Sequence, residues 1–315
     1  MKINSTENIM QKVFMEGGTL NLGYFADGPW GHNTLKKLLS DKSINIKFIC
    51  VRFENKDEVL INLGKQYNID ILCNKNINSE EFISILNQYN CDLFVSMSFN
   101  QIFRKEIINL TPLKIINCHA GKLPFYRGRN ILNWVLINDE KEFGITVHYV
   151  DEGIDTGDII LQRTYNINDN DNYKTLLDKA YIECANILYD AIKLIQNNKV
   201  NTIKQNSIHK VGSYFGIRQK GDEIIDWNMT SRYIFNFVRA ICEPGPKATS
   251  YINNKVIKIN KVKIVEDAIK YKSIPGQVVG KSKEKSFYVK TLDTIVEVLE
   301  YEYDGIIKIG DRLSR

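Results

Sequence analysis

Three side chains near the middle of this 315-residue chain have the types needed for acyl transfer. Asn117 and His119 stand two positions apart, and Asp155 follows downstream in an Asp-Thr-Gly turn. An amide N–H can stabilise a developing oxyanion, an imidazole can take a proton from a nucleophile, and a carboxylate can orient that imidazole. Because no Ser or Cys nucleophile is evident beside them, we expect the nucleophile to come with the substrate. This set predicts transfer of an acyl group to an amine.

Cys118 lies between the amide and the imidazole and could itself be a nucleophile. Successive residues of an extended segment point to opposite sides. We therefore expect Asn117 and His119 to face the site and Cys118 to face the core. The six cysteines lack Cys-x-x-Cys spacing, which predicts reduced thiols, and no His, Cys and carboxylate cluster has metal spacing, so we expect no metal. His148, on an apolar strand, is expected to be a structural histidine paired within the sheet.

These residues and their surroundings resemble the formyltransferases that use 10-formyltetrahydrofolate as cosubstrate. The family pattern is Asn-x-His followed by a distant Asp in an Asp-(Thr/Ala/Gly)-Gly turn, at the spacing found here. The matching segments are Asn117 to Pro124, Tyr126 to Arg129, Gly144 to His148 and Asp151 to Gly157. The resemblance covers nearly the whole chain. It implies that Asn117, His119 and Asp155 are the catalytic residues.

The resemblance also implies where the folate binds. The loop after the strand that ends at Met97 would contact it through backbone and apolar side chains, and the loop before Asp155 would hold the pteridine ring with main-chain groups. The implied residues are Phe99, Gln101, Ile102, Phe103, Asp151, Glu152, Gly153 and Ile154. On the sequence alone, the first loop is simply the start of a helix, and a merely structural turn is the weaker alternative for the second.

Gly121, Arg127 and Arg129 are the candidates for binding the amine-bearing substrate. Gly121 permits a close approach of the backbone to a ligand. The two guanidinium groups could bind a diphosphate or the folate glutamate bidentately, with the diphosphate slightly preferred. They could equally tie down their own loop.

The choice of substrate rests on the segment from Tyr126 to Asn138. It is similar to sugar-nucleotide formyltransferases such as the UDP-aminoarabinose enzyme, whereas methionyl-tRNA formyltransferases usually carry Arg-Gly-Ala-Ala-Pro there. The chain also lacks a long basic insertion after the first strand. The resemblance therefore implies an amino sugar carried by dTDP, UDP or GDP, of the kind used for O-antigen and other surface polysaccharides, and no nucleic acid partner. The alternatives are methionyl-tRNA formyl transfer and a non-catalytic folate-binding protein.

Composition sets bounds on these alternatives. The chain is 43% hydrophobic, which is ample for two domains, and its net charge is +5. Nineteen Lys and Arg against thirteen Asp and Glu give residues 206–315 a charge of +6, which suits a polyanion or a diphosphate, although Lys-rich strands are more often solvated faces. Residues 1–18 lack the apolar core of a signal peptide, and no stretch reaches the length of a membrane span. We expect a cytoplasmic protein without membrane contact, and a homodimer is compatible with the sequence.

The elements that position the site follow two patterns. From Leu20 to Asn197 short apolar runs alternate with helical spacing, which predicts an α/β fold with an open, mostly parallel, Rossmann-like sheet. The expected strands are 20–25, 44–51, 69–72, 93–97 and 113–116, and the expected helices are 33–39, 56–67, 79–88 and 172–197. Asn117 would directly follow the last strand, at the carboxyl edge where such sheets bind ligands.

Beyond the polar segment Lys199 to His209 the pattern changes. A helix over 231–240 and strands over 255–265, 277–280, 287–291 and 294–301 predict a small β-rich domain. It resembles the open barrel of oligonucleotide-binding (OB) type that the tRNA and aminoarabinose enzymes share. We expect a catalytic domain at 1–200, a linker at 201–210 and an OB-like domain at 211–315.

Overall fold

The structure is a computed structural model that describes residues 18–282 and 285–315. Residues 1–17 lie outside the described residues. The expectation that residues 1–18 are not a signal peptide falls almost entirely on them. The chain forms two compact units. The first comprises the residues up to Gly128 with Gly144–Thr164 and Lys179–Tyr214, and the second comprises Arg129–Phe143, Tyr165–Asp178 and Phe215–Arg315. The domain boundaries expected at 200 and 211 stay a prediction.

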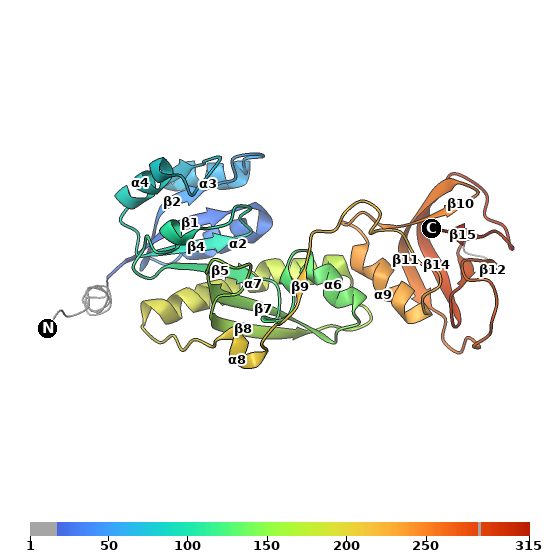
Figure 1. The fold of residues 1–315 in the computed structure, drawn as a ribbon. Coiled ribbons are helices and arrows are strands. Elements are labelled where there is room, and N and C mark those ends of the chain that lie inside the picture. Colours follow the sequence, from blue (N-terminus) through green and yellow to red (C-terminus); the bar gives the residue numbers. More distant parts are fainter. Residues whose placement is uncertain (1–17, 283–284) are drawn as a thin grey trace. The chain divides into compact units, whose positions relative to one another are not determined.

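The first sheet has seven strands in the order β3-β2-β1-β4-β5-β7-β8 (Figure 1). The strands are β1 (Leu20–Ala26), β2 (Ile44–Cys50), β3 (Asp70–Leu72), β4 (Leu93–Met97), β5 (Ile115–His119), β7 (Glu142–Tyr149) and β8 (Ile159–Asn166). The first five pair in parallel, and β7 runs antiparallel to β5. The expected open, mostly parallel α/β sheet is confirmed.

Helices connect these strands. They are α2 (Gly28–Leu39), α3 (Glu58–Tyr67), α4 (Glu80–Gln88), α5 (Lys105–Ile108) and α7 (Tyr173–Gln196). The α4 helix starts as its sequence predicts, since the Ser79 hydroxyl accepts from the Phe82 N–H at 3.3 Å. The α2 helix begins earlier than expected, because Pro29 stands in its first turn, where its fixed φ suits a helix start.

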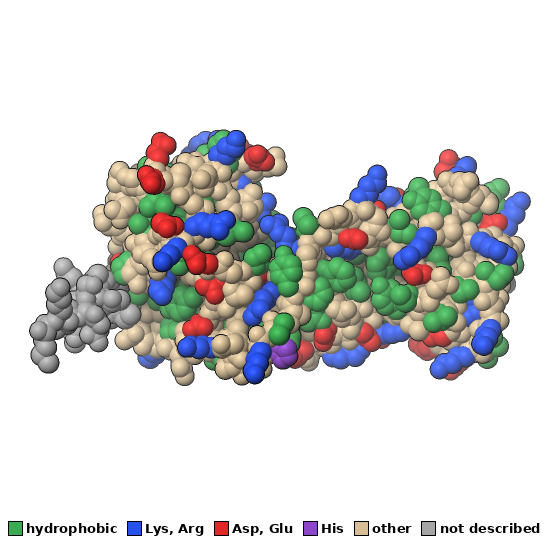
Figure 2. Space-filling model, viewed as in Figure 1, with side chains coloured by type: hydrophobic (Ala, Val, Ile, Leu, Met, Phe, Trp, Pro, Cys, Tyr) green, Lys and Arg blue, Asp and Glu red, His purple; other side chains and the backbone are tan. Residues whose placement is uncertain are grey.

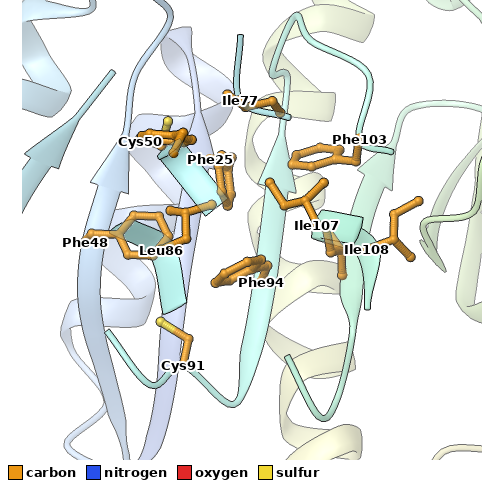
Figure 3. Close-up of a cluster of buried hydrophobic side chains, with 12 residues drawn as sticks. Phe25, Phe48, Cys50, Ile77, Leu86, Cys91, Phe94, Phe103, Ile107 and Ile108 are labelled. Atoms are coloured by element: carbon orange, nitrogen blue, oxygen red, sulfur yellow. The ribbon is translucent and has the colours of Figure 1, made fainter. Parts of the chain in front are cut away.

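Apolar side chains cover both faces of this sheet. On one face Phe25, Phe48 and Phe94 pack edge-to-face with one another, beneath side chains from α4 and α5 (Figure 3). On the other face the Cys118 thiol lies 3.7 Å from the carbonyl of Cys184 on α7. Burial on both faces explains why these strands read as nearly continuous apolar runs. The expectation that Cys118 points away from the site is confirmed.

The second sheet is antiparallel and lies in the C-terminal part of the chain (Figure 1). Its order is β12-β13-β14-β11-β10-β15, with β10 (Ala248–Ile252), β11 (Lys255–Ile264), β12 (Val278–Lys281), β13 (Phe287–Lys290), β14 (Ile295–Glu302) and β15 (Leu313–Ser314). Helix α9 (Ser231–Ile241) packs on β11 and on α6 (Ile131–Ile137). The expected β-rich C-terminal domain is confirmed.

One local expectation was wrong. Asn117 pairs with Ser96 of β4 and with His148 of β7, so it lies within the β5 strand instead of after it. The strand runs on to His119, because its last two residues still pair with β7. The segment expected to be a polar linker contains α8 (Gln205–Ile208), and the strand β6 (Arg127–Gly128) pairs with β9 (Tyr214–Phe215) just beyond it. The role of that segment as a linker stays a prediction. In the part of the chain that the structure describes, no helix combines the length and apolar character needed to span a membrane.

Candidate active site

The first two predicted catalytic side chains lie on β5, where that strand pairs with β7. Asn117 stands opposite His148, and His119 stands opposite Thr146. Residues paired across an antiparallel ladder project to the same side of the sheet, and so do residues two apart on one strand. Asn117, His119 and His148 therefore project from one side.

Asp155 completes the site from the loop between β7 and β8. Its backbone φ of 54° lies in the left-handed region, and its Oδ2 accepts from the Gly128 N–H at 2.9 Å. Oδ2 lies 3.6 Å from Nδ1 of His119, and Oδ1 lies 3.5 Å from Nε2 of His148. The Nδ2 of Asn117 lies 3.3 Å from the same Nε2. The structure thus brings the three predicted catalytic side chains together and adds His148 to them.

The main chain fixes where each imidazole carries its proton. The Nε2 of His119 donates to the Tyr126 carbonyl at 2.7 Å, and the Nδ1 of His148 donates to the Tyr149 carbonyl at 2.7 Å. A carbonyl oxygen only accepts, so each neutral ring presents a lone pair to the Asp155 carboxylate. A further proton on either ring would turn that contact into a charge-assisted hydrogen bond. The cluster is therefore arranged to accept a proton between the carboxylate and the rings.

The Asp155 carboxyl stays ionised although little of it is exposed. Burial by itself would raise its pKa. The charges of His119 and His148 and the hydrogen bond from Gly128 outweigh burial and hold the pKa well below its usual range. A negative charge is thus available across the neutral pH range to orient His119 and stabilise its charged form.

We expect the Asp155 carboxylate to stabilise the fold in a pH-dependent way. Because its pKa is lower in the folded than in the unfolded chain, its contribution is complete above the ordinary carboxyl pKa of about 4 and is lost as the pH falls further. Urea unfolding should show the largest difference in stability between the wild type and Asp155→Asn at neutral pH, and a shrinking difference below about pH 4. A difference that stays constant into acid would contradict this assignment.

His148 is the side chain that the sequence analysis did not assign to the site. It is buried in the sheet as expected, but it also contacts both Asn117 and Asp155. The available signal was its place at the end of a strand, seven positions before Asp155. Only the pairing of β7 with β5 shows that it stands opposite Asn117.

Gly121 lies against the catalytic imidazole. A Cβ at this position would lie 2.4 Å from the Tyr126 carbonyl oxygen and 2.5 Å from Nε2 of His119. Those two atoms form the hydrogen bond that orients the ring. The missing side chain therefore makes room for His119, and contact of Gly121 with a substrate stays a prediction.

The expected folate-binding residues after β4 have different environments. Phe103 is buried in the cluster of Figure 3, and Phe99 packs against that cluster. The side chain of Gln101 bonds main-chain groups of residues 74–77 at 3.0 and 2.9 Å. Ile102 is 52% exposed. Contact of this segment with folate stays a prediction.

A cavity of about 820 Å³ adjoins the loop before Asp155. Of the four expected residues of that loop, Asp151, Glu152 and Gly153 line the cavity, and Ile154 is exposed. The rest of its wall combines apolar and cationic side chains, among them Ile108, Pro112, Leu113, Val150, Lys105 and Lys114. Its apolar part has the character needed to hold a flat aromatic ring, and the two lysines stand with three acidic side chains, Asp151, Glu152 and Asp158.

Arg127 and Arg129 differ in their contacts. Arg127 donates from Nε and Nη2 to Oε1 of Gln205, at 3.1 and 2.7 Å, and from Nη1 to the Val211 carbonyl at 3.0 Å. Arg129 is exposed and belongs to the second unit. The contacts of Arg127 match the alternative in which it ties down its own loop, and anion binding by either residue stays a prediction.

The described residues contain no group of three or more His, Cys, Asp and Glu side chains that could hold a metal ion. The side chains that converge at the site are those of Asn117, the two histidines and Asp155. An amide donor, a proton acceptor and a buried carboxylate suit the attack of an amine on a carbonyl carbon.

Comparisons with known proteins agree with this chemistry. Residues 41–192 match the family described as "Formyl transferase", and residues 218–309 match "Formyl transferase, C-terminal domain". A methionyl-tRNA formyltransferase of Fusobacterium nucleatum is 35% identical over 226 residues, which are 72% of each chain. The bifunctional polymyxin resistance protein ArnA of Wigglesworthia glossinidia brevipalpis is 35% identical over 68% of this chain, which spans 32% of that longer protein.

Among solved structures, an N-formyltransferase of Helicobacter canadensis in complex with folinic acid and dTDP-3-aminofucose is similar to this chain. The TM-score is 0.68 and the identity is 25%, with 90% of this chain and all of that chain covered. The likeness therefore extends over most of both units.

Proposed function

The chain belongs to the formyl transferase family, and from this premise we propose that it moves a formyl group from 10-formyltetrahydrofolate to the amine of an amino sugar carried by a nucleoside diphosphate. The observation that carries the proposal is that Asn117, His119 and Asp155 come together in one cluster. Asp155 contacts both His119 and His148, and Asn117 contacts His148. A folate-binding protein without activity would not need this arrangement.

The cavity lined by Gly153 and Gly157 is the candidate for part of the folate donor; Asn117, His119, His148 and Asp155 are not among its lining residues, so the formyl group would have to extend beyond it to reach them. Ile108, Pro112 and Leu113 offer an apolar surface to a flat ring, and the loop through Gly153 offers main-chain groups to its polar edge. Lys105 and Lys114 are the cationic groups of this wall that would pair with the glutamate carboxylates, against the opposing charge of Asp151, Glu152 and Asp158. When bound, the donor supplies a formyl carbon activated for transfer.

In the proposed mechanism the neutral amine of the acceptor attacks the formyl carbon, a new C–N bond forms and the carbonyl oxygen becomes an oxyanion. One N–H of Asn117 faces His148 at 3.3 Å, and the amide keeps its second N–H for the oxyanion. Nδ1 of His119, which faces the Asp155 carboxylate, takes the proton that the amine loses. The bond from the formyl carbon to the folate nitrogen then breaks, that nitrogen gains a proton, and a formamide remains.

Two findings bear on the choice between a sugar and tRNA. The Helicobacter canadensis enzyme, with dTDP-3-aminofucose in its complex, supports the sugar. The identity with a methionyl-tRNA formyltransferase keeps tRNA as the alternative. The surface of the C-terminal sheet helps to decide between them.

The lysines of β11 are largely matched by glutamates of β14. In the sheet register Lys258 stands opposite Glu302 and Lys261 opposite Glu300. Cross-strand pairs of opposite charge neutralise each other, and the face visible in Figure 2 shows basic and acidic side chains interspersed over this part of the chain. A tRNA-binding surface would need unpaired positive charge along the phosphate backbone. The pairing of these lysines supports a small substrate, whereas the net charge of +6 over residues 206–315 is a feature that keeps tRNA as the alternative.

We expect dTDP-3-aminofucose, or a UDP- or GDP-linked amino sugar, to be formylated in preference to methionyl-tRNA at equal concentration. Mass spectrometry of both acceptors in one mixture with the donor measures the preference. The rate should also depend only weakly on salt, since a sugar diphosphate makes few ionic contacts, whereas tRNA binding weakens steeply as salt rises. Efficient formylation of methionyl-tRNA, with a steep salt dependence, would overturn the sugar assignment.

A further inference from the structure

We propose that Gln205 is a positioning residue for Asp155 and that Arg127 holds Gln205 in the required orientation; this deepens the proposed formyl transfer and rests on it. Gln205 lies on α8, in the segment whose sequence predicts only a polar linker. It is 3% exposed, which is unusual for a glutamine. A buried amide must have its hydrogen-bonding groups satisfied, and the partners of this one lie on the turn that carries Asp155.

The amide nitrogen of Gln205 bonds two carbonyl groups of that turn. Its Nε2 donates to the Asp155 carbonyl at 2.8 Å and to the Gly157 carbonyl at 2.7 Å. Asp155 has a φ of 54°, in the left-handed region that aspartate tolerates better than most residues, and the two hydrogen bonds from Gln205 help to hold this conformation. Gln205 fixes the main chain of Asp155, while the Gly128 N–H fixes its carboxylate. Together they set the direction in which the carboxylate faces His119.

Arg127 determines which way round the Gln205 amide lies. Its Nε and Nη2 both donate to Oε1 of Gln205, at 3.1 and 2.7 Å. A cation beside Oε1 keeps the oxygen on that side, and the nitrogen is then left to face the two carbonyls. With Arg127 absent the amide could turn over, and its oxygen would then lie against the oxygens of Asp155 and Gly157.

The residues that follow Gln205 support the other half of the site. Ser213 accepts from the Arg127 N–H at 3.0 Å through its carbonyl, and from the Tyr126 N–H at 2.9 Å through its hydroxyl. The carbonyl of Tyr126 is the group that holds Nε2 of His119. One short segment, residues 205–213, therefore fixes the backbone on which both members of the His119–Asp155 pair depend.

The test replaces Gln205 by Met, which keeps most of the volume and removes the hydrogen bonds. With dTDP-3-aminofucose and 10-formyltetrahydrofolate we expect kcat to fall by about 10- to 100-fold, as for a catalytic group displaced by part of an ångström, with little change in either KM. The imidazole titration of His119, followed by NMR in the free enzyme, should also shift, because its carboxylate neighbour has moved.

Gln196→Met is the matched control. Gln196 also joins a cation to a main-chain carbonyl, since its Nε2 donates to the Ser43 carbonyl at 3.1 Å and its Oε1 accepts from Lys193. Ser43 directly precedes β2, so this pair lies at the amino end of the parallel strands, away from the site. Gln196→Met should lower thermal stability and leave both kcat and the His119 titration unchanged.

Arg127→Met provides a second route if Gln205→Met does not fold. It should give the same fall in kcat, and the double variant should be no worse than Gln205→Met alone, because both act through one contact. Equal behaviour of the Gln205 and Gln196 variants, or a rise in KM alone, would overturn the proposal. If the wild type formylates none of the amines offered, the proposed function fails, and the His119 titration still tests the positioning role.

Discussion

The His119→Ala variant is expected to lose about 10³-fold in kcat, the usual contribution of a general acid–base group. Its imidazole bonds the Tyr126 carbonyl on one side and faces the Asp155 carboxylate on the other. Asn117→Ala should lose about 10²- to 10³-fold, as for an oxyanion donor. Steady-state kinetics with a saturating formyl donor measure both.

The losses should be strongly non-additive. Groups that act on one transition state fail together, so the double variant of Asn117 and His119 should be little worse than His119→Ala alone. His32→Ala is the matched control, because His32 lies 2.7 Å from Asp57 in another His–Asp pair of the first unit. It should keep nearly normal turnover. Nearly normal kcat in His119→Ala would remove the imidazole from the mechanism.

A second large effect is expected from adding a single methyl group at Gly121. The new Cβ would lie 2.4 Å from the Tyr126 carbonyl oxygen and 2.5 Å from Nε2 of His119, so the ring or its partner must move. We expect Gly121→Ala to lose most of its kcat, approaching the loss in His119→Ala, while far-ultraviolet circular dichroism stays close to that of the wild type.

Gly216→Ala is the control for Gly121→Ala. A Cβ at Gly216 meets no atom within 4 Å, and the backbone there does not adopt a positive φ. This variant should have the activity and stability of the wild type. If Gly121→Ala has the same activity as Gly216→Ala, then the ring of His119 either has more freedom than the structure shows or is not needed.

The sequence predicted those features that depend on local pattern. Apolar runs such as Leu93–Met97 mark the buried strands, and Ser79 marks the start of α4, because cap and burial preferences act over a few residues. Asn117, His119 and Asp155 could be named in advance because their types and spacing match a family, and the structure places them in one cluster.

The rest of the site depends on contacts between residues far apart in the chain. His148 lies 31 positions from Asn117, and Gln205 lies 50 positions from Asp155, so neither contact leaves a periodic trace in the sequence. The end of β5 was placed too early for the same reason, because its last residues are held by β7 and not by the neighbouring parallel strand. A polar segment such as the one around Gln205 is predicted to be a linker, because the sequence does not show that one of its glutamines is buried and hydrogen-bonded.

A donor labelled with ¹³C in its formyl group would show directly whether the protein transfers formyl to a sugar amine and whether His119 is needed. Wild-type protein, the labelled donor and dTDP-3-aminofucose or another nucleotide-linked amino sugar are mixed, and NMR follows the carbon. We predict that a ¹³C formamide signal appears on the sugar nitrogen, with a mass gain of one CO, and that His119→Ala produces almost none in the same time. A label that moves only to methionyl-tRNA would contradict the sugar acceptor. A label that moves equally well with His119→Ala would contradict the role of His119.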